Sequence, residues 1–262
     1  MQNLNTTHDI FINASQNMEQ IQNESIALVV TSPPYPMIEM WDDIMSKQNS
    51  KIDKAFKEGN GIKAFKEMHK ELDKVWSEVN RVLMPGGFVC INIGDATRTI
   101  DNKFGLYPNH AMIIESFQRL GMTNLPNIIW RKQTNSPNKF MGSGMLPAGA
   151  YVTLEHEWIL IFRKGEKRMF KSANEKLSRK ESSFFWEERN SWFSDLWDLK
   201  GTKQIISKAE TRNRSAAYPF EIPYRLINMY SLREDTVLDP FLGTGTTTLA
   251  AIACQRNSIG FE

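Results

Sequence analysis

The residues with the clearest chemical potential are Thr31-Ser32-Pro33-Pro34-Tyr35. Each proline fixes its own φ at about −65° and restricts the residue before it to extended conformations, so Ser32 and Pro33 are held rigid. Because proline has no N–H, the Ser32 hydroxyl and the Pro33 carbonyl remain free as hydrogen-bond acceptors. With the flat Tyr35 ring beside them, they would suit a planar group that carries an NH2. The alternative is a strand that ends in a proline turn.

The residues before this motif place it at the edge of a sheet. Residues 26–30, Ile-Ala-Leu-Val-Val, are apolar and rich in β-branched side chains, which predicts a short buried strand. Ser32 then follows the carboxyl end of that strand. In open α/β sheets, ligands bind in the crevice outside those ends. A functional site is therefore expected here.

A second group of residues follows a later predicted strand, residues 236–238. Residues 239–246, Asp-Pro-Phe-Leu-Gly-Thr-Gly-Thr, form a glycine-containing turn before a predicted helix at 249–254, and a strand at 258–261 then ends at Glu262. This order is typical of a nucleotide-type site, where glycines let the ligand approach the backbone and an acid binds ribose hydroxyls. Glu262 lies 23 residues after Asp239, close to the expected spacing of about 20.

The composition of this turn narrows the ligand. It has no Gly-x-x-x-x-Gly-Lys-Ser/Thr pattern, and the third glycine of a dinucleotide fingerprint would be residue 248, which is Thr. A carboxylate at Asp239 would repel a pyrophosphate, whereas it suits a cationic amino group such as that of S-adenosylmethionine. Together with the first motif, the turn favours S-adenosylmethionine as the cofactor.

The composition of the chain sets broad limits. Its 262 residues fit one large α/β domain or one domain with an insertion, and a charge of +2, from 32 basic and 30 acidic residues, permits nucleic-acid binding without arguing for it. Cys90 and Cys254 offer neither a disulfide framework nor a zinc spacing. No signal peptide or membrane span is evident. We therefore expect a soluble, cytoplasmic protein.

The remaining elements follow from hydrophobic periodicity. We predict strands at 10–12, 88–93, 127–130 and 151–163, and helices at 18–21, 62–83, 110–120 and 223–230. The strand at 88–93 would carry Gly94 and Asp95 to the same edge as Ser32. Polar residues 46–61 are interpreted as a mobile loop over the site, and residues 164–214, which lack a clean period, as an inserted module.

Two further segments invite a functional interpretation. Residues 131–137 are basic and residues 142–149 glycine-rich, so this stretch could follow a phosphate backbone or form an ordinary surface loop; the DNA-binding candidates are Arg131, Lys132, Asn135 and Lys139. His156-Glu157 is half of a metal-binding pattern, but position 160 is Leu rather than a second histidine. No metal site is predicted.

The motifs together resemble the amino-methylating DNA methyltransferases, in the permuted group where the catalytic motif precedes the cofactor motif. Residues 31–35 look like the catalytic motif in its serine form, which is more typical of cytosine-N4 enzymes than the Asp-Pro-Pro-Tyr of most adenine-N6 enzymes. Tyr218-Pro219-Phe220 is similar to the aromatic-proline element before the cofactor strand. Residues 239–246 resemble the methionine-binding loop, and Glu262 the ribose acid.

The resemblance implies a Rossmann-like α/β methyltransferase sheet with an inserted target-recognition region. Residues 1–132 would form the catalytic half, 133–217 the target-recognition insertion, with the strand at 151–163 as a candidate member of the sheet, and 218–262 the cofactor-binding part. The implied catalytic residues are Ser32, Pro33, Pro34 and Tyr35. The implied cofactor-binding residues are Thr31, Tyr218, Asp239, Pro240, Phe241, Gly243, Gly245, Thr246 and Glu262.

Two departures from the family pattern stand out. Ala14 occupies a position where the family usually has an Asp associated with the cofactor adenine, so adenine binding would lean on other groups. Relatives also usually continue past the acid by at least a helix, whereas this sequence stops at Glu262. Both departures favour, as one alternative, a DNA-binding relative that has lost catalysis.

The resemblance implies methylation of the N4 amine of a flipped cytosine in double-stranded DNA. Ser32 and the Pro33 carbonyl would accept the two N–H groups of the amine, and Tyr35 would stack on the base. Adenine-N6 methylation is the runner-up, followed by methylation of RNA or of a protein amide. A restriction endonuclease of the same system and a homodimer are further partners consistent with this interpretation.

Overall fold

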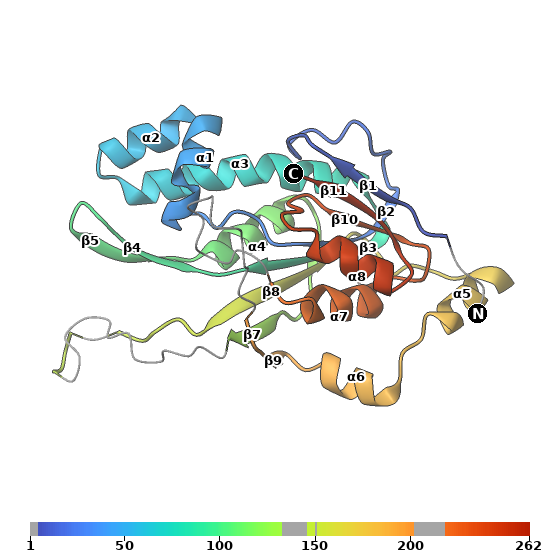
Figure 1. The fold of residues 1–262 in the computed structure, drawn as a ribbon. Coiled ribbons are helices and arrows are strands. Elements are labelled where there is room, and N and C mark those ends of the chain that lie inside the picture. The colour runs from blue at the N-terminus through green and yellow to red at the C-terminus, as the bar shows by residue number, and fades with distance from the viewer. Residues whose placement is uncertain (1–4, 133–145, 150, 202–217) are drawn as a thin grey trace, which may run out of the picture.

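The computed structural model describes residues 5–132, 146–149, 151–201 and 218–262. In this part of the chain, a nine-stranded sheet runs in the order β1-β11-β10-β2-β3-β8-β7-β9, and β6 pairs with β8 (Figure 1). The strands are β1 (His8–Phe11), β2 (Ile26–Thr31), β3 (Leu83–Ile93), β6 (Thr123–Asn124), β7 (Ile128–Lys132), β8 (His156–Arg163), β9 (Leu196–Leu199), β10 (Thr236–Asp239) and β11 (Asn257–Phe261).

Strand direction divides the sheet into two parts. β1, β11, β10, β2 and β3 are parallel, β8 is antiparallel to both β3 and β7, and β9 is parallel to β7. The carboxyl ends of β10, β2 and β3 therefore lie at one edge of the sheet, together with the start of β8. The predicted Rossmann-like α/β sheet is confirmed.

Helices cover both faces of the sheet. α3 and α4 lie on one face and α7 and α8 on the other (Figure 1). The central strand β2 is buried on both sides, because Val29 packs in the cluster that contains α3, while Leu28 and Val30 pack in the cluster that contains α7. The helices are η1 (Glu39–Trp41), α1 (Asp42–Gln48), α2 (Ser50–Lys57), α3 (Gly61–Val82), α4 (Asn109–Arg119), α5 (Ala173–Glu181), α6 (Trp186–Trp192), α7 (Glu221–Tyr230) and α8 (Thr246–Ala253).

The prediction of a mobile loop at residues 46–61 is wrong, because this stretch is mostly helical. The Asn49 side chain caps α2 by accepting a hydrogen bond from the Lys51 backbone N–H at 3.0 Å. Asn60 caps α3 in the same way through Lys63 N–H. Only Ile52 and Ala55 of α2 are buried, so its polar residues are the solvent-facing side of a short amphipathic helix.

Several predicted boundaries also change. Residues 18–21 form turns rather than a helix, and β8 begins at His156 instead of residue 151. β3 begins at Leu83 and runs through the predicted helix stop at residues 85–87, where its register with β2 is irregular. The hairpin of β4 (Ala96–Ile100) and β5 (Lys103–Tyr107) was not predicted and extends away from the main sheet (Figure 1).

The segment interpreted as an inserted module contains α5, α6 and β9. β9 pairs in parallel with β7, and Trp197 of β9 is buried together with Trp130 of β7. This part of the predicted recognition region is therefore anchored on the main sheet. Among the helices in the described ranges, none has both the length and the apolar character needed to cross a membrane.

Candidate active site

The two sequence motifs meet on adjacent parallel strands. β2 pairs with β10 through Leu28 and Val237, so residues 31–35 and the turn after Asp239 leave the sheet side by side. Thr31 Oγ1 donates a 2.6 Å hydrogen bond to Asp239 Oδ1, and both side chains are buried. Residues 208 positions apart in the sequence are thus joined directly.

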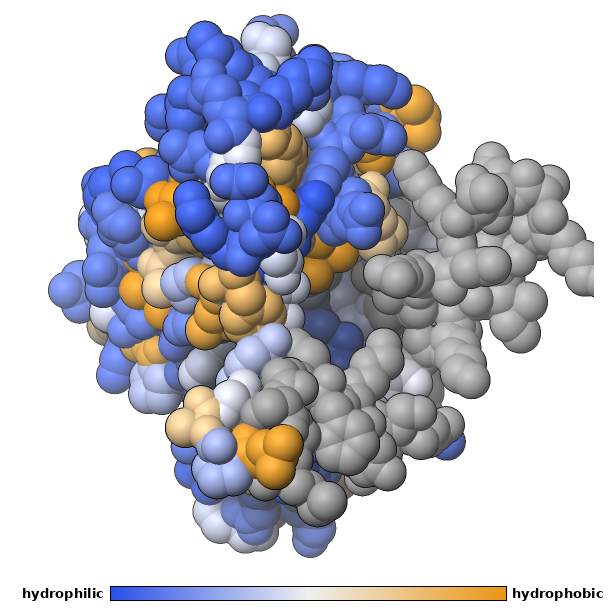
Figure 2. Space-filling view, turned by 90° about the vertical axis from the view of Figure 1, so that its left-hand side faces the viewer, coloured by the Kyte–Doolittle hydropathy of each residue, from blue (hydrophilic) through white to orange (hydrophobic). Residues whose placement is uncertain are grey.

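A cavity of about 650 Å³ opens where these strands end. Figure 2 faces this edge of the sheet, where the surface is hollowed beside apolar residues. Thr31 and Gly245, which were also predicted, are not among the residues that line it. The predicted residues that line the cavity are Ser32, Pro33, Pro34, Tyr35, Tyr218, Asp239, Pro240, Phe241, Gly243, Thr246 and Glu262.

Asp239 is bound on both carboxylate oxygens by the protein. Oδ1 accepts from Thr31 Oγ1 and from the Phe241 backbone N–H at 3.1 Å. Oδ2 accepts from Thr247 Oγ1 and from Tyr218 Oη, the latter at 3.4 Å. Burial raises the pKa of Asp239, while hydrogen bonds from Thr247 and Thr31 oppose the rise. Asp239 therefore ties the cofactor turn to the catalytic strand.

Glu262 is the most accessible of the carboxylates that line the cavity. It is exposed, and its Oε2 accepts a 2.8 Å hydrogen bond from the Gly243 N–H, which links the end of β11 to the turn. Gly245 has a φ of 79°, and an added Cβ would meet no atom within 4 Å, so the backbone conformation rather than crowding favours glycine there. These features fit a ligand with hydroxyl groups lying against the turn.

The Ala14 position lies in the wall of the same cavity, between Asn13 and Ser15. Gln16 also lines it, and its amide donates to Glu71 Oε2 at 3.3 Å. Polar groups other than the missing Asp are therefore available near this wall.

Tyr35 is held by a partly buried polar network. Its hydroxyl donates to Glu157 Oε2 at 2.8 Å and accepts from Asn92 Nδ2 at 2.8 Å and from Ser32 Oγ at 3.2 Å. Asn92 Nδ2 also donates to Glu157 Oε2 at 2.7 Å. Burial, followed by the nearby Glu157 charge, raises the pKa of Tyr35, so its phenol stays protonated and acts as a donor to Glu157.

Lys132 completes this network. Its ammonium forms an ion pair with Glu157 Oε1 and lies 4.6 Å from the centre of the Trp130 ring. Lys132 also lines the cavity. The other described DNA-binding candidate, Arg131, does not line it and pairs with Asp198 at 2.6 Å. Asn135 and Lys139 lie outside the described residues.

Sequence reasoning missed Asn92 and gave Glu157 only a rejected metal role. The signal for both is positional, since β8 runs antiparallel to β3 and its first residues therefore lie beside the carboxyl end of β3. Gly94 was placed at the right edge, and the structure gives its reason: an added Cβ would lie 3.0 Å from Tyr35 Cε2. In the described ranges, no group of three or more His, Cys, Asp or Glu is arranged to hold a metal ion.

A second network holds the far end of the catalytic segment. Asn109 Nδ2 donates to the carbonyls of Pro36 at 3.1 Å and Gly94 at 2.9 Å. Its amide oxygen is then the acceptor for His69 Nε2–H at 3.0 Å. Burial lowers the pKa of His69 to about 4, although Asn109 and Asp73 act in the opposite direction.

Comparison with protein families assigns this arrangement. The model of the N6_N4_Mtase family, described as DNA methylase, matches residues 26–262, which includes both motifs and the cavity between them. The chain belongs to this DNA methylase family. S-adenosylmethionine, the cofactor predicted from the turn, is confirmed as the cofactor of the family.

Curated relatives cover nearly all of this DNA methylase. It is 58% identical over 99% of its length to the type II methyltransferase M.MthZI of Methanothermobacter thermautotrophicus, covering 74% of that protein. It is 50% identical over 99% of its length to the type II methyltransferase M.MjaI of Methanocaldococcus jannaschii, covering 88% of that protein.

Solved structures agree with the fold of this DNA methylase. A putative DNA modification methylase of Thermus thermophilus, complexed with S-adenosyl-L-methionine, has a TM-score of 0.74 and 30% identity, covering 98% of this chain and 88% of the other. The PvuII DNA methyltransferase, described as cytosine-N4-specific, has a TM-score of 0.68 at 20% identity over 98% of this chain and 83% of the other. At that identity the likeness concerns the fold alone.

Proposed function

We propose that this DNA methylase acts in the cytoplasm on double-stranded DNA and methylates the N4 amine of cytosine. The serine of residues 31–35, held against the cofactor turn through the Thr31–Asp239 hydrogen bond, is the observation that carries this proposal. The expected order of the motifs, with the catalytic one first, is part of it. A restriction endonuclease of the same system would be its functional counterpart, and a homodimer stays open.

The residues around Ser32 suit an exocyclic amine. S-adenosylmethionine supplies an electrophilic methyl group when bound, and an amine conjugated to a ring is a weak nucleophile. The Ser32 hydroxyl donates to Tyr35 and retains lone pairs, so Ser32 Oγ and the Pro33 carbonyl can accept the two N–H groups of the amine. Such rigid acceptors stabilise a more tetrahedral nitrogen without reorganisation.

The Tyr35 network adds a route for the proton that the amine loses. Ser32 Oγ donates to Tyr35 Oη, which donates to Glu157 Oε2. If Ser32 takes the amine proton and each hydroxyl passes its own proton along, the proton ends on the Glu157 carboxylate. Glu157 would thus supply the base that the serine motif lacks, while Asn92 and Lys132 hold it in place.

The target base must leave the duplex to reach this cavity, at a cost of a few kcal/mol. Contacts between DNA phosphates and basic residues would offset that cost and make binding sensitive to salt. We assign these contacts to the recognition region, residues 133–217, including the predicted Asn135 and Lys139.

Substitution of Ser32 and Tyr35 tests the proposed roles. Ser32→Ala and Tyr35→Ala should each lower single-turnover methyl transfer about a hundredfold or more, since preorganised hydrogen bonds or base stacking are lost. Titration calorimetry should still detect S-adenosylmethionine binding. Ser77→Ala, an exposed serine on α3, is the matched control. Loss of cofactor binding in both variants would contradict the assignment.

Mass spectrometry of nucleosides from methylated DNA tests the target base. N4-methylcytosine is the expected product, whereas N6-methyladenine would replace the cytosine assignment with the runner-up. Methylated RNA or protein without methylated DNA would overturn the proposal. An absence of S-adenosylmethionine binding would support the inactive DNA-binding alternative.

Glu157→Gln tests the proton route. Glutamine keeps an acceptor for Tyr35 but removes the carboxylate, so single-turnover methyl transfer should fall by about a hundredfold while cofactor binding persists. The control is Glu155→Gln, which lies before the first residue of β8 and outside the cavity. Unchanged transfer in Glu157→Gln would refute a role for Glu157 as the base.

A further inference from the structure

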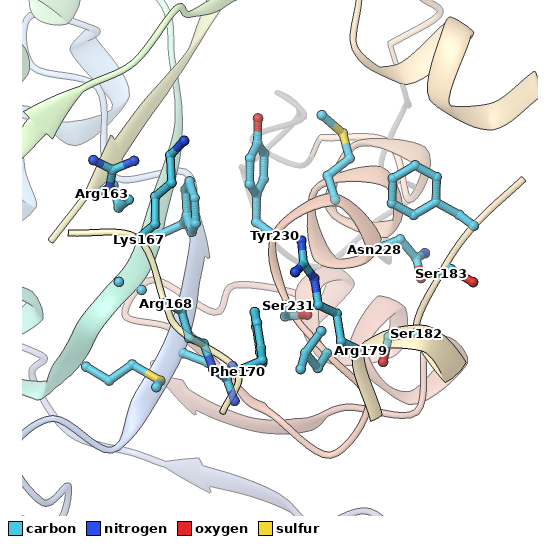
Figure 3. A pocket seen from close by; sticks show the side chains of 18 residues that line it. Arg163, Lys167, Arg168, Phe170, Arg179, Ser182, Ser183, Asn228, Tyr230 and Ser231 are labelled. Carbon is cyan, nitrogen blue, oxygen red and sulfur yellow. The ribbon is translucent and has the colours of Figure 1, made fainter. Parts of the chain in front are cut away.

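A second cavity, of about 480 Å³, opens at the opposite edge of the sheet from the active site. It lies where β3 begins and β8 ends, and residues of α5 and α7 complete its walls (Figure 3). Gly87, Arg163, Arg179 and Asn228 are among the residues that line it. No residue of this cavity takes part in the proposed methyl transfer.

The lining of this cavity is strongly cationic. Arg163, Lys167, Arg168 and Arg179 line it, and no Asp or Glu does, although the whole chain carries a charge of only +2. Arg168 is neutralised by Asp235 at 2.8 Å. Among the described residues, the other three cations have no carboxylate partner. Such a concentration of uncompensated charge in a hollow favours an anionic ligand.

Most of the uncharged polar side chains of the cavity are already engaged. The Ser182 and Ser183 hydroxyls donate to the carbonyls of Ser178 at 2.8 Å and Lys180 at 2.7 Å. The Asn228 amide donates to the Tyr224 carbonyl at 2.9 Å. The donors left for a ligand are therefore the cationic side chains and the Tyr230 hydroxyl. This pattern suits a phosphate better than a neutral polar group.

Aromatic rings lie among the cations. The guanidinium groups of Arg168 and Arg179 lie 5.2 and 4.9 Å from the centre of the Phe170 ring. The rings of Phe88 and Tyr230 stack with centroids 4.7 Å apart. In Figure 3, Arg163 and Lys167 lie on one side of the cavity and Arg179 on the other, with Tyr230 between them. A planar apolar group could therefore lie between two cationic walls.

We propose that this cavity binds a free nucleoside phosphate, with the phosphate on Arg163, Lys167 and Arg179 and the base near Tyr230 and Phe170. Its volume is within the range of small-molecule sites. A hollow of this size admits a single nucleotide, whereas the phosphates of a duplex follow a long outer surface. A duplex is therefore the competing source of the same chemical group.

Calorimetric titration of the full chain tests this proposal. Saturating S-adenosylhomocysteine is added first so that the active-site cavity is occupied, and ADP, adenosine and inorganic phosphate are then titrated separately. ADP should bind most tightly, and adenosine at least about tenfold more weakly because it lacks the phosphates. Arg179→Gln and Lys167→Gln should each weaken ADP binding by about tenfold. Both side chains are exposed, so neither substitution should unfold the chain.

The matched control is Lys176→Gln, an exposed lysine on the same helix as Arg179 but outside the cavity. It should leave ADP binding unchanged. The proposal is overturned if ADP does not bind, or if it binds equally to Arg179→Gln and the control. Displacement of ADP by a short duplex without a target cytosine would instead assign the cavity to DNA. None of these results depends on which base is methylated.

Discussion

Two buried titratable side chains hold the catalytic segment from opposite ends. Asp239 acts before the segment, through Thr31, and His69 acts after it, through Asn109 and the Pro36 carbonyl. Burial favours the neutral form of both groups, and so it raises the pKa of Asp239 and lowers that of His69 to about 4. The two ends of the segment are therefore expected to respond to acid in opposite directions.

The difference follows from linkage. An acid whose pKa is higher in the folded state adds most to the free energy of unfolding below its unfolded pKa of about 3.9. This contribution is lost as the pH rises through the folded pKa. A histidine whose pKa is lowered in the folded state adds fully to the free energy of unfolding above its unfolded pKa of about 6.5. This contribution is lost as the pH falls toward the folded pKa. Acid therefore weakens the His69 end and not the Asp239 end.

Of the substitutions at the two ends of the segment, Asp239→Ala should lower the free energy of unfolding most. Donors from Thr31, Phe241, Thr247 and Tyr218 would lose their acceptor inside the core, at a cost of roughly 4 kcal/mol in the free energy of unfolding. Urea denaturation at pH 7 measures this loss. Asp198→Ala removes a partly exposed ion pair with Arg131 and should cost less than about 1 kcal/mol. If the two substitutions lowered the free energy of unfolding equally, Asp239 would stabilise the fold no more than a surface ion pair does.

His69→Gln should remove the loss of stability that acid causes at the His69 end of the segment. Between pH 7 and pH 5, the pKa shift of His69 costs the wild type about 2 kcal/mol, because only the unfolded chain takes up the proton. Glutamine can still donate to Asn109 but does not titrate. Between pH 7 and pH 5, the stability of the variant relative to the wild type should therefore rise by this amount. A constant difference between pH 5 and pH 7 would contradict the burial of a neutral His69.

Thr31→Val should have the smallest effect and sharpens the role of Asp239. Valine keeps the shape of threonine but removes one donor, while Phe241 N–H still binds the same oxygen, so the loss should be about 1 kcal/mol. In a double-mutant cycle with Asp239→Ala, the two losses of unfolding free energy should not add, because once either side chain is replaced the hydrogen bond is already absent. Additive losses would argue against the Thr31–Asp239 bond.

Local patterns predicted the parts of the site that a single segment encodes. The apolar run 26–30 and the prolines after it correctly predicted a buried strand that delivers Ser32 to the sheet edge. The glycine-containing turn likewise predicted the entry into α8. Helix α2 was missed because only two of its residues are buried, which leaves little hydrophobic signal.

Contacts across strands could not be predicted in this way. Asn92 and Glu157 meet only because β8 runs antiparallel to β3, and no periodicity within either strand records that direction. The four-donor environment of Asp239 likewise depends on residues from β2, α8 and the segment before α7. The division at residues 132 and 217 and the DNA contacts of Asn135 and Lys139 stay predictions.

The pairing of β2 with β10 also has a consequence for how the chain folds. The contact between Thr31 and Asp239 closes a loop of 208 residues, so its entropic cost is met only after the intervening strands and helices have formed. During synthesis, β2 leaves the ribosome long before β10 exists. The edge of β2 that will receive β10 is then an unpaired apolar strand, and this early intermediate is where we expect aggregation to compete with folding.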